Sequence, residues 1–378
     1  MKQYLIATIS TLVASGSLAM AQETDIQPET LIVEERISEG EHVFIMDMGI
    51  ATPSQISVLN ADDLSMEGNI GAGNFSQMMI SPDHSSIYTA SVYMSRYNYG
   101  DIEAVLHEWD AATLTAKREF VINDKLAQTL TQKGTLNLSA DGAFMIVQNA
   151  TPATSVSVIN MADGTEVAEI PTPGCWTAYP AVEGSAFTML CGDGTVAKYS
   201  YTAEGSAGDP GKSEKIFDAD ADPLFGNAHR VDGNLVYISY SGSLYVVDDS
   251  GDVPVLTKTI DFAEDGWAPS GYGLMGYHEP SKTMFVTMHQ NPSDGSHKMP
   301  AAEIWAINMD SGQVVGRGEA SGESNITVSG GENPVIFGTD HVGGVHRYDV
   351  VLGDEVTITK ATSRDGVALF PTLLVTDY

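Results

Sequence analysis

The sequence is poor in cysteine and in basic residues. Its 378 residues include two cysteines, and 18 lysines and arginines stand against 50 aspartates and glutamates, for a formal net charge of −32. A chain this acidic repels phosphate backbones and anionic lipid surfaces, because both are bound by clustered lysine and arginine. We therefore expect no nucleic-acid partner and no membrane partner. Cationic proteins, cations or amines would be attracted, although the charge also suits a surface adapted to salty water.

Long apolar runs are missing except at the N-terminus. Lys2 is followed by a largely apolar stretch from Tyr4 to Met20, and Ala19-Met20-Ala21 fits the small-x-small pattern of a signal peptidase site. An uncleaved anchor is the alternative, but the apolar stretch is short and polar residues follow it at once. We expect residues 1–21 to be a cleaved signal peptide that exports the chain to the periplasm, and residues 22–39 to be a polar N-terminal arm.

Catalytic motifs are also missing. The chain has no Gly-x-Ser-x-Gly elbow, no His-Glu-x-x-His, no glycine-rich phosphate loop and no Cys-x-x-Cys. Its nine histidines are scattered, so we interpret them as packing or surface residues. The sequence therefore predicts no catalytic residue and no cofactor in this chain.

An acidic cluster from Asp218 to Asp222 resembles the opening of a calcium loop. The sixth position, which needs glycine, is Pro223, and the twelfth, which needs a bidentate glutamate, is His229. We interpret the cluster as a solvated acidic turn and predict no metal site.

The two cysteines, Cys175 and Cys191, are 16 residues apart (191 − 175). In an exported protein such a pair favours a disulfide, and two buried free thiols remain the alternative.

Short strand-like runs recur along most of the chain, at intervals of about 48 residues. Each run ends in a polar or acidic residue before a turn, and it is preceded by a second turn of the Ser-x-Asp-Gly type that leads into an apolar strand. Helical periodicity is hard to find. The runs end at Asn60, Asp110, Asn160, Ser200, Asp248, Asn308 and Asp349.

Repeats of this length with about four short strands each are typical of β-propeller blades. We predict an all-β fold, with residues 40–378 forming a single seven-bladed β-propeller; two β-sandwiches are the alternative. The units span roughly 40–70, 75–122, 135–170, 175–217, 225–260, 271–319 and 324–360. The last stretch, from Val367 to Asp377, should pair with the first blade and close the ring.

Several segments carry a family resemblance. They are Val147–Val156, Gly174-Cys175-Trp176, Phe187–Gly194, Trp267–His278 and His297–Trp305, the last of which contains Pro-Ala-Ala-Glu-Ile-Trp. Together they resemble the large (heavy) subunit of aromatic amine dehydrogenase and, more distantly, that of methylamine dehydrogenase. The resemblance covers essentially the whole mature chain.

The resemblance implies a non-catalytic large subunit in a heterotetramer of two large and two small subunits. The small subunit would carry tryptophan tryptophylquinone, made from two of its own tryptophans. It would oxidise primary amines to aldehyde and ammonia and pass the electrons to a periplasmic copper protein or a cytochrome. Trp176 and Trp305 of this chain would then be structural residues.

The resemblance also assigns roles to three residues. Phe75 matches the phenylalanine that lines the substrate channel to the quinone, although ordinary blade packing is the alternative. Cys175 and Cys191 match the disulfide of the large subunit. The neighbouring Met78 and Met79 could belong to a subunit interface or to the core.

Two positions depart from the family pattern. Of a basic segment in the second blade only Arg96 remains, within Ser95–Glu103, and a glycine is replaced by Ser270. Docking of the small subunit or of the electron acceptor would therefore differ. Two other functions stay open: a stand-alone periplasmic propeller that binds a ligand or a protein, and a propeller hydrolase with calcium in its central channel.

Overall fold

The computed structural model describes residues 34–50, 52–206 and 208–378. Two compact units divide the chain, Met1–Glu35 and Arg36–Tyr378, and all thirty strands belong to the second. The predicted signal peptide and most of the predicted arm lie outside the described residues. One short 3-10 helix, η1 (Ser296–Lys298), is the only helix in the described chain, so the all-β prediction is confirmed.

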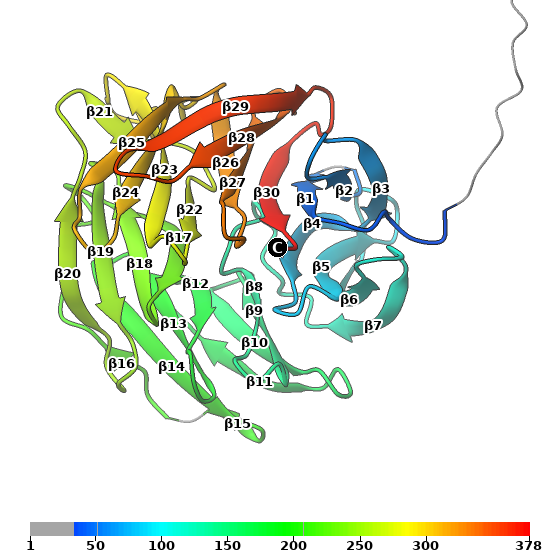
Figure 1. Cartoon of the computed structure of the whole chain (residues 1–378). Coiled ribbons are helices and arrows are strands. Elements are labelled where there is room, and N and C mark those ends of the chain that lie inside the picture. The colour runs from blue at the N-terminus through cyan, green and yellow to red at the C-terminus, as the bar shows by residue number, and fades with distance from the viewer. Residues whose placement is uncertain (1–33, 51, 207) are drawn as a thin grey trace, which may run out of the picture. The chain divides into compact units, whose positions relative to one another are not determined.

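Five antiparallel sheets of four or five strands form separate blades of a β-propeller arrangement (Figure 1). Strand order follows the sequence within each blade, as expected for a repeated meander. The blades between residues 74 and 261 coincide closely with the predicted units. Their strands are β4 (Asn74–Ile80), β5 (Ser86–Met94), β6 (Ile102–Asp110), β7 (Ala116–Ile122); β8 (Leu136–Leu138), β9 (Phe144–Asn149), β10 (Ser155–Asn160), β11 (Glu166–Pro171); β12 (Cys175–Pro180), β13 (Ala186–Cys191), β14 (Val196–Thr202), β15 (Gly205–Ser206), β16 (Gly211–Lys212); and β17 (Leu224–Val231), β18 (Asn234–Ser239), β19 (Ser243–Asp248), β20 (Val255–Asp261).

The fifth separate blade joins the two ends of the propeller unit. Its strands are β30 (Pro371–Thr376), β1 (His42–Asp47), β2 (Gln55–Asn60) and β3 (Met66–Gly71), in that order. Strand β30 pairs with β1 from Val43↔Thr376 to Asp47↔Pro371, so the predicted return of the last stretch to the first blade is confirmed. Figure 1 shows the red C-terminal strand beside the blue β1. This pairing removes the free edges that an open chain of blades would leave.

The remaining strands form one nine-stranded sheet, so the predicted count of seven separate blades is not observed. A parallel pairing of β25 with β29, at Gly316↔Val356 and Arg317↔Thr357, joins two meanders into this sheet. Glycine permits the approach, because a Cβ on Gly316 would lie 2.0 Å from the Val356 carbonyl oxygen. The strands are β21 (Trp267–Pro269), β22 (Met275–His278), β23 (Thr283–Gln290), β24 (Glu303–Asn308), β25 (Val314–Glu319), β26 (Glu323–Val328), β27 (Val335–Asp340), β28 (Val345–Val351) and β29 (Val356–Arg364).

The core lies between successive sheets rather than at one centre. Both faces of a blade are covered by its neighbours, so consecutive residues of one strand are buried in different clusters. In β1, Val43 and Ile45 pack with Phe337 of β27, whereas Phe44 and Met46 pack with Ile87 of β5. This arrangement explains the continuous apolar runs in the inner strands.

At one end of the ring, four hairpin turns share the same hydrogen-bond pattern, and we call this end the turn face. Each begins with an Asn or Asp whose backbone carbonyl accepts the N–H of the residue four positions later. The side-chain oxygen of that first residue accepts a second N–H within the turn. The turns span residues 60–65, 110–115, 160–165 and 308–313, and they account for the recurring strand endings in the sequence.

Candidate functional site

The opposite end of the ring, which we call the Phe75 face, is where the innermost strand of each blade begins. The loops that join the second and third strands of the blades lie at the same end, because the strands alternate in direction. Hydrogen bonds connect the beginnings of neighbouring inner strands, as described below. The segments of this face include 48–50 and 52–54, 95–101, 150–154, 192–195, 240–242, 291–302, 341–344 and 365–370, together with the strand ends that flank them.

Phe75 lies at the beginning of β4, in a bulge of the pairing with β5 between Asn74 and Gln77. Its φ is 51°, in the left-handed region that is unusual for a non-glycine residue. The backbone N–H of Phe75 donates to the Gly49 carbonyl at 2.9 Å, and the Phe75 carbonyl accepts from Gln77 Nε2 at 3.1 Å. The side chain is half-buried. The bulge therefore sets the backbone direction at Phe75, at the beginning of an inner strand.

Trp176 occupies the equivalent place in β12, also beside a bulge and next to a residue in the left-handed region, Thr177 with φ of 58°. Its indole Nε1 donates to Gln132 Oε1 at 3.1 Å, which connects it to the preceding blade. Two aromatic side chains thus begin inner strands on this face, both half-buried.

Side-chain hydrogen bonds join the inner strands around the ring. Thr131 Oγ1 donates to the Ser76 carbonyl at 2.6 Å, and Thr177 Oγ1 donates to the Gly226 carbonyl at 2.9 Å. Asn227 donates to the Tyr272 carbonyl. Asn325 Nδ2 donates to the Pro371 carbonyl at 3.1 Å. These contacts tie neighbouring blades together at this end of the ring.

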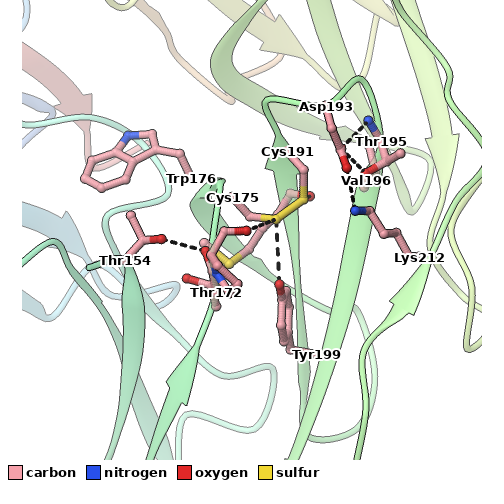
Figure 2. Close-up of a disulfide and its surroundings, with 12 residues drawn as sticks. Thr154, Thr172, Cys175, Trp176, Cys191, Asp193, Thr195, Val196, Tyr199 and Lys212 are labelled. Carbon is pink, nitrogen blue, oxygen red and sulfur yellow. Dashed lines mark hydrogen bonds and ion pairs between the residues drawn. A yellow bond between two sulfur atoms is a disulfide. The ribbon is translucent and has the colours of Figure 1, made fainter.

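The disulfide between Cys175 and Cys191 braces the same face, so the expected pairing is confirmed. The two residues are directly opposite each other at the ends of β12 and β13, with Cα atoms 4.0 Å apart. Both are buried, and the Tyr199 hydroxyl donates to Cys175 Sγ at 3.6 Å. Figure 2 shows the indole of Trp176 projecting away from the disulfide. The bond therefore ties together the ends of β12 and β13 beside Trp176.

Exposed apolar side chains are more numerous on the Phe75 face than on the turn face. Eight of the fourteen large apolar or aromatic residues that are exposed in the described chain lie there, and five lie on the turn face. The exposed tyrosines belong to the Phe75 face, where Leu369 (90% exposed) and Val342 (82%) are the most accessible. Exposed apolar patches mark protein-binding surfaces, and five different loops of this face contribute exposed apolar groups. The eight are Ile50, Tyr93, Tyr97, Tyr99, Ile102, Met299, Val342 and Leu369.

The loop with the reduced basic charge forms the tip of the β5–β6 hairpin on this face. Arg96 lies 5.6 Å from the centre of the Tyr99 ring, and Tyr97 and Tyr99 are 66% and 60% exposed. Tyrosine and arginine are enriched at protein interfaces. Ser270, the other departure, is fully buried, and its N–H donates to the Thr287 carbonyl.

Two of the four tryptophans, Trp267 and Trp305, pack together in the interior of the propeller. Trp267 and Trp305 are neighbours, with ring centres 5.4 Å apart, but Trp305 is fully buried. Its indole Nε1 donates to Glu303 Oε2 at 2.7 Å, and Arg317 covers its ring at 3.7 Å. An amine has no access to that ring, which is a core residue.

Two of the histidines, His278 and His289, and the acidic turn serve the local structure. His278 hydrogen-bonds Ser281 and the Gly331 carbonyl, and His289 hydrogen-bonds Ser296 and the Ala268 carbonyl. Asp218 accepts N–H groups of its own turn. Within the residues that the structure describes, no group of three or more His, Cys, Asp or Glu side chains has a metal-binding arrangement.

Lys133 and His229 are functional candidates that the sequence reading missed. Lys133 Nζ lies 3.1 Å from His229 Nε2 although the residues are 96 positions apart. Burial lowers the pKa of Lys133 to about 8, and burial together with the nearby Lys133 lowers the pKa of His229 to about 3. Both side chains are partly exposed, and many surrounding protein atoms still desolvate them. Lys133 borders a cavity. No local motif signals this pair.

Met78 and Met79 belong to the interior of the ring. Met78 is 2% exposed, and both residues border the cavity inside the inner strands. Of the two alternatives, the structure favours the core for Met78, and Met79 is half-buried beside it. Among the described residues, no helix has the length and apolar character needed to cross a bilayer.

Solved structures of similar shape show the fold alone. One is a putative 6-phosphogluconolactonase from Bacteroides fragilis (TM-score 0.63, 10% identity, 92% of this chain and 99% of that chain). Another is Hsv2p of Kluyveromyces lactis (TM-score 0.55, 10% identity, 85% of this chain and 98% of that chain).

Sequence comparisons identify the family. The methylamine dehydrogenase heavy chain of Methylophilus methylotrophus is 23% identical over 382 aligned residues, covering 96% of this chain and 93% of that protein. The heavy chain from Methylobacillus flagellatus is 21% identical, covering 79% and 76%. The family model for the methylamine dehydrogenase heavy chain matches residues 39–370, which include Phe75, the disulfide and the Phe75 face almost entirely. The chain belongs to the methylamine dehydrogenase heavy chain family.

Proposed function

We propose that the chain is the non-catalytic large subunit of a quinoprotein amine dehydrogenase, which deaminates primary amines oxidatively to aldehyde and ammonia. The observation that carries the proposal is the family match over residues 39–370. The burial of Trp305 under Arg317 fits a structural role for this residue, as expected if the quinone belongs to a separate subunit. That small subunit would carry tryptophan tryptophylquinone, which accepts the two electrons of the amine.

The Phe75 face is the proposed docking surface for the small subunit. Its exposed apolar residues surround the channel mouth, and an obligate interface needs an apolar surface of this kind. Two large and two small subunits would form the heterotetramer. The sparse positive charge of the 95–101 loop means that contact there would depend on Tyr97 and Tyr99 rather than on salt bridges.

Phe75 would line the substrate route between the subunits. Its left-handed backbone and the hydrogen bond to Gly49 hold the ring in place without a partner, so the aromatic wall is preorganised. An aromatic wall excludes water and selects substrates by shape. We propose aromatic or bulky primary amines as the preferred substrates on this basis and on the resemblance to the aromatic amine dehydrogenase large subunit.

The nine-stranded sheet would count as two blades in a seven-bladed propeller. Its two meanders are joined by two residue pairs, whereas strands within each meander pair over most of their length. Strands β26 to β29 alone form a four-stranded antiparallel unit. This interpretation restores the seven repeats of the sequence.

The proposed compartment is the periplasm, reached through a cleaved signal peptide at residues 1–21. The disulfide supports an oxidising location. A periplasmic copper protein or cytochrome would accept the electrons.

A periplasmic pull-down with the tagged full chain tests the proposal. We expect a small, cysteine-rich subunit to copurify with a quinone absorbance that bleaches on addition of tyramine. A clean monomer with no chromophore would instead identify a stand-alone binding propeller. Hydrolytic activity of the isolated chain that a chelator abolishes would favour the propeller hydrolase with calcium in its central channel.

The role of Phe75 is tested in the same complex. We expect Phe75→Ala to reduce the preference for tyramine over methylamine in kcat/KM, because it removes the aromatic wall. The matched control is Phe144→Ala, which removes a half-buried phenylalanine at the other end of the ring. Equal effects of the two variants on the substrate ratio would assign Phe75 to packing alone.

A further inference from the structure

The inner strands line a partly open cavity of about 210 Å³. Strands β4, β8, β12, β17 and β30, with Lys133 just before β8, supply its walls, so it lies inside the ring. Apolar side chains dominate the lining, and three polar residues, Lys133, Asn137 and Tyr179, complete it. The apolar lining comprises Met78, Met79, Ile80, Leu136, Ala228, Leu373 and Val375.

Lys133 is the one charged residue of this lining. Among residues 34–50, 52–206 and 208–378, no acidic side chain lies within ion-pair distance of its ammonium group. The outer lysines of the same chain behave differently: Lys125 meets Glu169 at 2.7 Å, and Lys212 meets Asp193 at 2.5 Å. An ammonium group in an apolar cavity is costly unless an anion or several acceptors compensate it.

Neither polar neighbour supplies the missing negative charge. His229 Nε2 also lies 2.9 Å from the Met275 carbonyl oxygen, which requires an N–H on that nitrogen and leaves it no lone pair for Lys133. The Tyr179 hydroxyl hydrogen-bonds the Lys133 and Gly226 carbonyls and accepts the Ala228 N–H. The ammonium protons therefore point to an acceptor from outside the chain.

We propose that this cavity binds a small organic carboxylate, whose carboxylate group pairs with Lys133 and whose short hydrocarbon part lies against the apolar lining. A monovalent anion matches the single cation, and the apolar walls favour a hydrocarbon part over a fully hydrated inorganic ion. A cationic amine is repelled by Lys133, so this site differs from any amine site at the channel mouth. The proposal does not rest on the proposed function.

The direct test titrates butyrate into the full chain, in its complex where one copurifies, by calorimetry at constant ionic strength. We expect saturable binding by the wild type and at least tenfold weaker binding by Lys133→Met, which keeps the length of the side chain and removes the charge. Butyramide, the neutral analogue of the same shape, should also bind at least tenfold more weakly. Lys360→Met, at an exposed lysine of β29, is the control and should leave the affinity unchanged.

The pH dependence of butyrate affinity tests whether Lys133 is the charged group that binds the carboxylate. Lys133 faces His229 and Tyr179, and neither changes charge between pH 7 and 9, because the pKa of His229 is about 3 and burial raises that of Tyr179 above its usual value. Butyrate affinity should therefore fall by roughly tenfold for each pH unit above the point at which Lys133 loses its proton.

A second variant tests the apolar part without touching the charge. Ala228→Leu should narrow the cavity, weakening butyrate at least tenfold while formate binding persists. Equal binding of butyrate and butyramide, undiminished binding by Lys133→Met, or chloride binding as strong as that of butyrate would each overturn the proposal.

Discussion

The two ends of the ring differ in the regularity of their turns and loops. On the turn face, four hairpins repeat one six-residue turn, in which residues 60, 110, 160 and 308 are Asn or Asp and the fifth position is Leu or Gly in the left-handed region. On the Phe75 face, the connecting loops differ in length and sequence from blade to blade. The regular end gives the sequence its visible period, and the irregular end carries the exposed aromatic groups, the disulfide and Phe75.

The comparison teaches where function can be found in such a chain. A repeated turn has one local requirement, which is to hydrogen-bond its own backbone N–H and C=O groups. Each copy meets this requirement with the same hydrogen bonds. Loops that need not repeat can instead differ, and recognition residues are concentrated on loops held by a rigid scaffold. The predictions below separate the channel and the Phe75 face from the turn face.

The largest expected effect concerns Lys133, inside the channel. Its pKa is about 8 in the folded chain against a usual value of 10.5. Between these values the unfolded chain holds a proton that the folded chain has lost, so the free energy of unfolding rises with pH in this window. From pH 8 to pH 10.5, we expect the free energy of unfolding of the wild type to rise by about 3 kcal/mol relative to that of Lys133→Met. Denaturant unfolding at each pH measures this difference.

The comparison with Lys133→Met isolates this gain, because both chains share the other titrating groups. Lys360→Met should follow the wild type at every pH, since Lys360 is exposed. A difference between the wild type and Lys133→Met that stays constant across the window would show that Lys133 is well solvated.

Much of the fold was predictable from the sequence, and the channel was not. The turns at Asn60 and Asn160 are local, so they reveal the all-β repeat and its spacing. Closure of the ring could also be predicted, because a final strand that belongs to no blade needs a pairing partner. The sequence predicted seven separate blades, which are not observed, because it cannot show that glycines in β25 allow two meanders to pair.

The candidate site was predictable only in part. The disulfide could be expected from two cysteines 16 residues apart in a chain with a predicted signal peptide, and Phe75 from its family resemblance. Its bulge and left-handed backbone depend on the pairing of β4 with β5. Lys133 and His229 meet through the closure of the ring across 96 positions, and no spacing rule connects them.

The second effect concerns the disulfide on the Phe75 face. Removing it by Cys175→Ala together with Cys191→Ala frees a loop of 16 residues, which should lower the free energy of unfolding by about 3 kcal/mol or somewhat less. Denaturant unfolding in oxidising buffer measures the loss. Reductant should destabilise the wild type and leave the double variant unchanged; equal stability of both in oxidising buffer would contradict a bracing role.

The third effect tests which end binds the partner. Leu369→Asp places a charge at a 90% exposed position on the Phe75 face, and Val351→Asp does the same at a 64% exposed position on the turn face. We expect Leu369→Asp to weaken association with the small subunit by about tenfold, or about 1.4 kcal/mol, because a charge is buried in an apolar interface. Val351→Asp should bind as the wild type does. Calorimetry or surface binding of the purified subunits measures both, and the reverse order would place the docking surface at the turn face.

The smallest effect concerns a single turn of the regular end. Asn160 Oδ1 accepts the Ala162 N–H at 2.9 Å, and Asn160→Ala removes that acceptor, which should cost about 1 kcal/mol in unfolding free energy. Asn160→Asp should restore most of it, because Asp110 fills the same role in another blade by accepting the Ala112 N–H at 3.1 Å. Neither variant should change partner binding or butyrate affinity. Loss of either binding with Asn160→Ala would mean that the two ends are mechanically coupled, and the separation of a structural end from a functional end would then fail.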